Sequence, residues 1–293
     1  MFSFCTDPSA LPQWQWLACY LTSGTHLAFY WSFVVVIVLI LIVAPAALLL
    51  GFGGVLALRS RSAALRWLGM GYTAMVRGVP DVVFFLFVPI AVDQGLEYLM
   101  HKVRCPYVDG PVRQATDFVV CAAAKVPLSS SPEWLHDFYA FALAVLAFSL
   151  VFGAFATNTL YGAMRAVPKA QTETAEAYGM SKGQAFRRVL LPQMWIFALP
   201  GLSNLWMLLI KATPLLFLLG IQDIVFWARE LGGSKTSIYT FPHSDWRLWY
   251  FLVVLVFYLA FTWVSERGFS RLMDRMSLGQ DTSGGERLRR GRA

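Results

Sequence analysis

Charged residues are scarce in this sequence. Asp, Glu, Lys and Arg make up 14% of the 293 residues, whereas 57% of the residues are hydrophobic. Soluble domains carry about a quarter charged residues, so this composition argues against a soluble globular protein and makes lipid the expected solvent. The first 25 residues also lack Lys and Arg, and the sequence therefore lacks the positive n-region of a cleavable signal peptide.

The motifs of common enzyme sites are absent as well. The sequence has no Walker-type glycine loop, no nucleophile elbow, no metal-ligand spacing and no internal repeat. Four histidines fall outside the apolar segments, where a lone histidine is expected to be a surface residue: His26, His101, His136 and His243. We therefore predict no catalytic residue, no metal and no cofactor, and the net charge of +7 requires no nucleic-acid partner.

Long apolar segments are what the sequence has in abundance. Phe29–Leu58 contains no charged residue, and at about 1.5 Å per residue it exceeds the roughly 30 Å hydrocarbon core of a bilayer. The predicted spans are Phe29–Leu58, Val82–Val92 with its flanks, Phe138–Met164, Met194–Gly220 and Trp246–Val264. The sequence thus predicts an all-α, polytopic membrane protein with about five transmembrane helices.

The basic residues predict the orientation. Sixteen of the 24 Lys and Arg residues fall on one side of these spans, in residues 59–77, 165–188 and 267–292, while seven fall on the other side. The remaining one, Lys211, lies inside the fourth span. Because cytoplasmic loops are enriched in Lys and Arg, we expect the N-terminus outside and the C-terminus in the cytoplasm.

All four cysteines fall on the predicted outer side: Cys5, Cys19, Cys105 and Cys121. An oxidising compartment permits disulfides, and four cysteines allow three pairings between which the sequence does not choose. Four unpaired thiols are the alternative interpretation.

A helix-breaking sequence precedes the second span, with Arg77, Gly78 and Pro80 followed by Asp81. Proline disfavours helix at the residue before it, and a Gly/Pro break in a short span often marks a transport path. An ordinary loop between a surface helix and a span, with Arg77 paired to Asp81 if the helix continues, is the alternative.

The polar stretch ETAEAYGMSKGQAFRRVLLP, residues 173–192, separates two apolar spans. Its first half is rich in helix-forming Ala and Glu, Gly179 suits the left-handed position after a helix, and Ser181 can cap a second helix. We expect Pro192 to end that second helix, whose apolar side consists of Phe186, Val189, Leu190 and Leu191. Residues 165–192 far exceed a typical helix–helix connection of about two to eight residues, so we predict a helical hairpin that docks into a partner's groove.

This hairpin resembles the E-A-A…G…I-x-L-P coupling loop of ABC importer permeases. The matching residues are Glu173, Thr174, Ala175, Gly179, Val189, Leu191 and Pro192, with Thr174 in place of the middle alanine. The segments YTAMVRGVPD, ALPGLSN and LLIKATPLLFLLGIQDIV resemble the polar amino acid branch, and the likeness is greatest to histidine/lysine/arginine/ornithine and opine importers. It covers roughly residues 30–90 and 138–275.

The resemblance implies an ABC importer permease fold and a set of partners. Two ATPase subunits would each accept one coupling hairpin, a homologous permease or a second copy would pair with the chain, and an extracytoplasmic solute-binding protein would deliver the substrate. The chain would not be an enzyme, since ATP hydrolysis belongs to the partner. Its place would be the bacterial inner membrane, in contact with lipid, and its cargo polar amino acids, with a lean to basic ones or opines.

Polar residues in the spans are candidates for the substrate path, because charges at membrane depth are costly and usually functional. They are Asp81, Asn158, Asn204, Lys211 and Thr213. Asp81 and Lys211 could hold the ammonium and carboxylate of an amino acid. The alternative is a structural role for each, with Lys211 snorkelling or pairing across the dimer. Relatives commonly carry Glu and Arg where this chain has Asn158 and Tyr161, which weakens the case for lysine or arginine.

The expected organisation is an outer segment 1–28, a permease domain 29–276 and a disordered basic tail 277–293. The permease domain would contain an outer insertion, 93–137, and the cytoplasmic hairpin, 165–192. Two rival functions are considered. A stand-alone channel or secondary transporter would not require the hairpin, and an integral-membrane enzyme would require a catalytic constellation that the sequence lacks.

Overall fold

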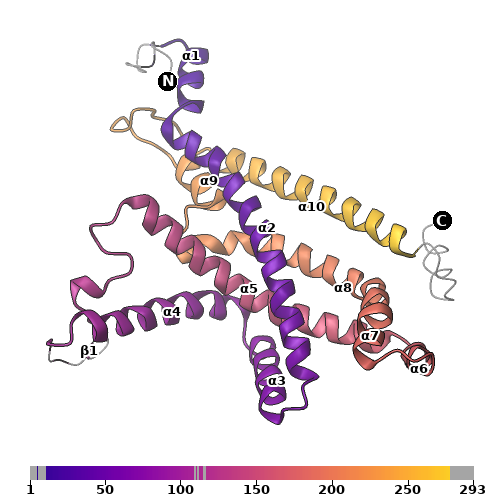
Figure 1. The fold of residues 1–293 in the computed structure, drawn as a ribbon. Coiled ribbons are helices and arrows are strands. Elements are labelled where there is room, and N and C mark those ends of the chain that lie inside the picture. Colours follow the sequence, from indigo (N-terminus) through magenta and orange to yellow (C-terminus); the bar gives the residue numbers. More distant parts are fainter. Residues whose placement is uncertain (1–4, 6–10, 109, 111, 115–116, 278–293) are drawn as a thin grey trace. The chain divides into compact units, whose positions relative to one another are not determined.

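The computed structural model describes Cys5, residues 11–108, Gly110, residues 112–114 and residues 117–277. The expected disordered tail lies outside these residues beyond Ser277, as does most of 1–10. The described part is mostly helical (Figure 1). Its elements are α1 (Gln13–Leu21), α2 (Gly24–Leu58), α3 (Ala63–Gly78), α4 (Asp81–Arg104), β1 (Arg113–Gln114), β2 (Asp117–Phe118), η2 (Ala122–Ala124), α5 (Glu133–Ala166), α6 (Lys169–Ala177), α7 (Lys182–Ala185), η3 (Phe186–Leu190), α8 (Leu191–Ala212), η4 (Thr213–Leu219), α9 (Ile224–Gly232) and α10 (Arg247–Ser277).

Five helical stretches are long and apolar enough to cross a membrane, which confirms the predicted all-α membrane architecture. They are Gly24–Leu58, Asp81–Arg104, Glu133–Ala166, Lys182–Leu219 and Arg247–Met276. Each is longer than the apolar run that predicted it, because the helices continue into polar flanks. Of the expected insertion 93–137, only residues 105–132 lie outside these long helices.

The structure confirms the predicted helix break before the second span. α3 ends at Gly78, and α4 begins at Asp81 directly after Pro80, whose backbone is extended. Proline fixes its own φ and disfavours helix at the preceding residue, which explains the two-residue interruption. The helix does not continue across it, and no ion pair joins Arg77 to Asp81 among the residues that the structure describes.

The chain divides into two compact units, the first of which comprises residues 1–46, 76–151 and 212–256. Its core contains the stacked rings of Phe85 and Phe148, whose centroids lie 4.2 Å apart. α4 therefore organises this unit, with η2 and η4 packed against it.

The second unit comprises residues 47–75, 152–211 and 257–293. Here α2 and α5 approach closely through small residues, as membrane helices commonly do. A Cβ built on Gly54 would lie 2.7 Å from the Cγ2 atom of Thr157, and one on Gly51 would lie 2.8 Å from the Cβ of Ala156. Val55, Leu160 and Met194 belong to the buried apolar cluster beside this contact.

Candidate functional site

Within the predicted hairpin of residues 165–192, the first helix is α6, which ends in a tight, hydrogen-bonded turn. The Gly179 N–H donates to Glu176 O at 3.0 Å, and the Met180 N–H donates to Ala175 O at 3.1 Å. This pair of bonds is the Schellman motif, which requires a left-handed residue after the helix. Gly179 supplies it with a φ of 84°, so the prediction for this glycine is confirmed.

The second half of the hairpin starts with a capping box. The Gln184 N–H donates to Ser181 Oγ at 3.4 Å, and the Ser181 N–H donates to Gln184 Oε1 at 2.9 Å. The reciprocal bonds satisfy two N–H groups that the first turn of a helix leaves without intrahelical partners. Ser181 therefore caps α7, as predicted, and only one residue, Met180, lies between Gly179 and this cap.

The expectation that Pro192 ends the second helix is wrong. The chain stays helical from Lys182 to Ala212, and Pro192 lies in the first turn of α8. The turn before it, Phe186–Leu190, is a π-helix. A proline has no N–H, and its ring crowds the carbonyl four residues earlier; the wider π turn shifts the hydrogen-bond register at this point, so the helix continues past the proline.

The base of the hairpin is buried in the second unit. Ala175, Ala185 and Leu190 have exposed fractions of 6%, 2% and 9%, and α6 packs against both α7 and η3. The guanidinium of Arg59 lies over the ring of Phe186, 5.4 Å from its centroid. Val189 and Leu191 are half-buried. These contacts fix the hairpin to the adjoining helices as a compact body.

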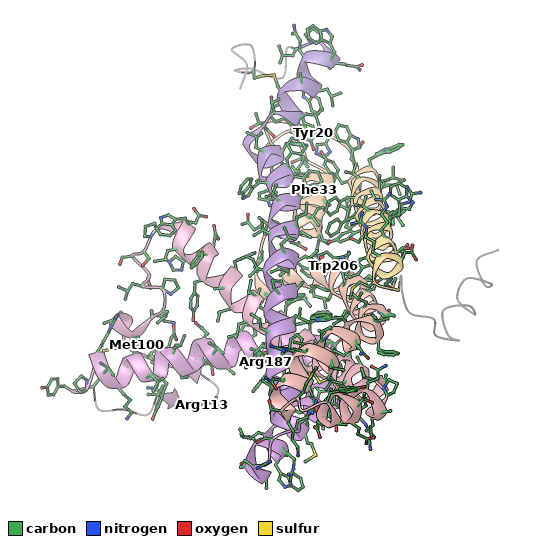
Figure 2. All side chains as sticks on the ribbon, turned by 45° about the vertical axis from the view of Figure 1, so that its right-hand side comes forward. Tyr20, Phe33, Met100, Arg113, Arg187 and Trp206 are labelled. Atoms are coloured by element: carbon green, nitrogen blue, oxygen red, sulfur yellow. A yellow bond between two sulfur atoms is a disulfide. The ribbon has the colours of Figure 1, made fainter. Side chains whose placement is uncertain are left out.

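The solvent-exposed surface of the hairpin is polar and aromatic. Glu173 and Thr174 are exposed, and the ring of Tyr178 at the turn has an exposed fraction of 85%. Arg187, labelled in Figure 2, is one of the exposed basic residues on the second half. A rigid protrusion that presents an exposed tyrosine is well suited to protein–protein contact, since Tyr is enriched at interface hot spots. The sequence reasoning did not single out Tyr178.

The candidate path residues fall in both units. Asp81 is exposed in the first turn of α4, and Thr213 is fully buried at the start of η4, which packs against α4. In the second unit, Asn158 is half-buried on α5 and donates to Ala154 O at 3.3 Å. Asn204 and Lys211 are exposed on α8. The pairing of Asp81 with Lys211 around a substrate stays a prediction.

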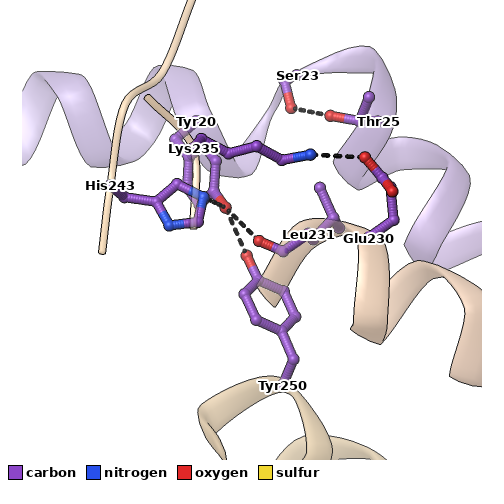
Figure 3. A network of polar contacts seen from close by, with 8 residues as sticks. All are labelled: Tyr20, Ser23, Thr25, Glu230, Leu231, Lys235, His243 and Tyr250. Carbon is purple, nitrogen blue, oxygen red and sulfur yellow. Dashed lines mark hydrogen bonds and ion pairs between the residues drawn. The ribbon is translucent and has the colours of Figure 1, made fainter. Parts of the chain in front are cut away.

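A hydrogen-bonded aromatic network ties the first unit together at the N-terminal end of α2 (Figure 3). The Tyr20 hydroxyl donates to Leu231 O at 3.2 Å and lies 3.0 Å from His243 Nε2, and the Tyr250 hydroxyl donates to Tyr20 at 3.2 Å. His26 Nε2 lies 2.6 Å from the Tyr250 hydroxyl. The network links α1, α2, the loop after α9 and α10.

The prediction that the histidines are surface residues is wrong for two of them. His26 and His101 have exposed fractions of 1% and 6%. His26 lies in the first turn of α2 and bonds the Tyr250 hydroxyl, while His101 lies near the end of α4, where its Nδ1 accepts the Cys121 N–H at 3.1 Å. Both are buried because a hydrogen-bond partner is available, and such a partner cannot be read from local sequence.

The four cysteines form two disulfides, Cys5–Cys19 and Cys105–Cys121, with Cα atoms 5.6 and 6.7 Å apart. This is one of the three pairings that the sequence left open. A ring nitrogen of His101 and the sulfurs of Cys105 and Cys121 lie within 4.8 Å of one another, a spacing that could suit a metal ion. The two sulfurs are joined to each other in a disulfide, and the Nδ1 atom of His101 accepts a backbone N–H.

Asp223, a residue that the sequence reasoning missed, is a fully buried carboxylate in the first unit. Its Oδ1 accepts the Phe226 N–H at 2.9 Å and so caps α9, whereas its Oδ2 has no hydrogen-bond partner among the described residues. Burial raises the pKa of Asp223 to about 6, against the opposing effect of the backbone N–H groups. The only sequence signal is an Asp just before an apolar helical run.

We expect Asp223 to make stability depend on pH. The folded-state pKa of about 6 lies above the ordinary value of 3.8, so the unfolded chain loses its proton first as the pH rises. The free energy of unfolding should therefore fall between about pH 4 and pH 6, by up to about 3 kcal/mol, and then level off. Asp223→Asn retains a capping side chain and should flatten this part of the curve. Thermal unfolding of both proteins in detergent across this range tests it, and parallel curves for the two would contradict it.

Comparison with known proteins identifies a family to which the sequence is similar. The family model for the binding-protein-dependent transport system inner membrane component matches residues 49–277. The histidine/lysine/arginine/ornithine transport system permease protein HisQ of Salmonella typhimurium is 32% identical over 234 residues, which are 80% of this chain and 86% of HisQ. The nopaline transport system permease protein NocQ of Agrobacterium fabrum is 31% identical over 222 residues, which are 74% of this chain and 78% of NocQ.

A solved structure agrees on the fold. The crystal structure of an amino acid ABC transporter with histidines contains a chain that matches 84% of this one, and 93% of that chain is covered, with a TM-score of 0.59 and 18% identity. The family match covers most of the sequence, and five helices are suited to a membrane. The chain therefore belongs to the binding-protein-dependent transport system inner membrane components, as a multi-pass ABC permease subunit whose ATPase is a separate subunit.

Proposed function

We propose that this permease serves an ATP-driven importer of polar amino acids, with basic amino acids or opines as the favoured cargo. The support for the class is the similarity to HisQ, over 80% of the chain, and to NocQ, over 74%. The carboxamide of Asn158 carries no charge and bonds its own helix, which is a reason to test neutral polar amino acids beside the basic ones.

The proposal depends most on one observation, the rigid hairpin. A Schellman turn, a capping box and a buried base hold residues 173–178 in place, with Glu173, Thr174 and Tyr178 exposed and Ala175 buried beneath them. We assign Glu173, Thr174, Ala175 and Gly179 to contact with an ATPase subunit, Ala175 through the buried face that supports the others. Val189, Leu191 and Pro192 would transmit motion of the hairpin to α8, since they lie where the two are continuous.

The orientation follows from the same assignment. The hairpin and the basic residues that flank it would face the cytoplasm, with the N-terminus and the segment 105–132 outside. Both disulfides would then lie in the oxidising compartment, where such bonds persist. A second permease, either a copy or a homologue, and a solute-binding protein would complete the importer.

The substrate would pass near the break at Arg77, Gly78 and Pro80. The break places Asp81 at the first position of α4. Its side-chain carboxylate could bind the ammonium group of an amino acid. Asn158, Asn204, Lys211 and Thr213 are the further candidates, and Lys211 could meet the carboxylate.

Reconstitution tests this proposal. The chain would be purified with its ATPase, its second permease and its binding protein, and uptake into proteoliposomes would be measured for arginine, lysine, histidine, ornithine, glutamine and nopaline. We expect uptake that requires ATP and the binding protein and that exceeds the ATP-free background at least tenfold for one of these solutes. Equal uptake by the purified chain without an ATPase would instead indicate a stand-alone channel or secondary transporter.

A further inference from the structure

A groove of about 870 Å³ runs along one face of α4 in the first unit. Residues one helical turn apart line it, among them Phe87, Ala91, Gln94, Tyr98 and Lys102, and the β1–β2 segment closes its far end with Arg113. In Figure 2, Met100 and Arg113 mark the end of α4 where β1 lies. Glu97 and His101, each two turns after the lining residues Ile90 and Gln94, are buried, so they border the groove, whose own residues Phe87, Ile90 and Tyr98 are exposed.

The lining changes from apolar to basic along the helix. Phe87 and Ile90, near the middle of the span, have exposed fractions of 62% and 54%. Tyr98, Lys102 and Arg113 lie at the other end, and the Lys102 ammonium is 5.7 Å from the centroid of the Tyr98 ring. A groove that is apolar along most of its length and ends in two cations is complementary to an amphiphile with a negatively charged head.

The length of the groove fits a membrane lipid. Phe87 and Lys102 are 15 positions apart in the sequence, which is about 22 Å along a helix at roughly 1.5 Å per residue. One leaflet, with its headgroup region, is about 20–22 Å thick. A single lipid parallel to α4 would therefore place its chain against Phe87 and Ile90 and its head between Tyr98 and Arg113.

The charged side chains of the groove favour an anionic lipid headgroup. Among the residues that the structure describes, the groove lining includes two basic side chains and no Asp or Glu. Neither Lys102 nor Arg113 forms an ion pair with a carboxylate among the residues that the structure describes. A phosphodiester accepts hydrogen bonds from both cations, whereas the amine of a zwitterionic head would find no anionic partner in the lining.

We propose that this groove binds one anionic phospholipid, such as phosphatidylglycerol, with its phosphate between Lys102 and Arg113 and an acyl chain along Phe87, Ile90 and Ala91. The lipid would join the β1–β2 segment to α4 through a shared headgroup. This site is separate from the hairpin and from the candidate path residues, and it does not depend on which solute the importer carries.

Site-specific photocrosslinking tests the proposal. The photoreactive amino acid p-benzoylphenylalanine replaces Tyr98, which lines the groove, or Leu99, which is 60% exposed and lies outside the lining. The complete complex is placed in nanodiscs of nine parts phosphatidylcholine and one part phosphatidylglycerol, and the lipid adducts are identified by mass spectrometry. We expect adducts at position 98 to be enriched at least fivefold in phosphatidylglycerol, and adducts at position 99 to match the composition of the bilayer.

Charge variants then locate the headgroup. Lys102→Gln with Arg113→Gln should abolish the enrichment at position 98, whereas Arg229→Gln, a control in α9 that removes one positive charge outside the groove, should leave it unchanged. Gly95 lines the groove with nothing within 4 Å of a built Cβ, so Gly95→Leu should lower all lipid adducts at position 98. Equal composition at positions 98 and 99, enrichment that survives the double variant, or crosslinking to the solute-binding protein in place of lipid would overturn the proposal.

Discussion

Replacing Gly179 by valine is expected to lower ATP-driven uptake at least tenfold while the chain still inserts into the membrane. The backbone at this position has a φ of 84°, and a left-handed conformation costs a residue with a Cβ about 1–2 kcal/mol. A β-branched side chain is at the upper end of that range or beyond it. About 2 kcal/mol is a factor of about 30 in an equilibrium, which lowers the population of the native turn by that factor relative to its alternatives.

The matched control for this change is Gly183→Ala in the same hairpin. Gly183 has helical geometry within α7, and a Cβ built on it meets nothing within 4 Å. Alanine there should be neutral or stabilise the helix by up to about 1 kcal/mol. ATPase co-purification and uptake are measured for both variants, and the coupling assignment fails if Gly179→Val keeps the ATPase bound and transports at the wild-type rate.

Replacing Gly54 by valine is expected to disrupt the second unit. The new Cβ would lie 2.7 Å from the Cγ2 atom of Thr157 on α5, well inside contact distance, and both atoms belong to helices that cannot separate without loss of packing. Overpacking of this kind costs about 1–3 kcal/mol. We expect a thermal unfolding midpoint lowered by several degrees and a reduced yield of monodisperse protein in detergent.

Gly53→Val is the control, because a Cβ built on the neighbouring Gly53 meets nothing within 4 Å. Both variants introduce the same side chain into the same turn of α2, so helix propensity and hydrophobicity change equally. Only the contact with α5 differs. If the two midpoints fall together, the close approach of α2 and α5 is not the reason for glycine at position 54.

The parts of this protein that could be predicted from sequence are those fixed by near neighbours. A lone glycine followed two residues later by serine predicted the turn and the cap of the hairpin, because a Schellman motif and a capping box are made within a few residues. Charge-poor segments predicted five spans, because the cost of burying charge in lipid depends on composition and length. The resemblance of residues 173–192 to the coupling loop led to the family.

Features that depend on distant partners could not be predicted in this way. The burial of His26 requires Tyr250, which is 224 residues away. The small-residue contact between Gly54 and Thr157 requires two helices to face each other, and the sequence pattern does not give their rotation. Pro192 was expected to end a helix because proline usually does so, whereas the π turn that precedes it keeps the helix intact.

The two disulfides bear on how the protein should be handled. The Cys105–Cys121 disulfide joins the end of α4 to the start of η2, and the Cys5–Cys19 disulfide joins Cys5 to α1. Thiol reagents such as dithiothreitol, often added when membrane proteins are extracted, reduce accessible disulfides, and the half-buried Cys105–Cys121 bond is more accessible than the buried Cys5–Cys19 bond. Expression routes that keep these segments away from an oxidising environment would have the same effect, so a preparation that is inactive after reduction should be repeated without reductant before a partner or a cargo is dismissed.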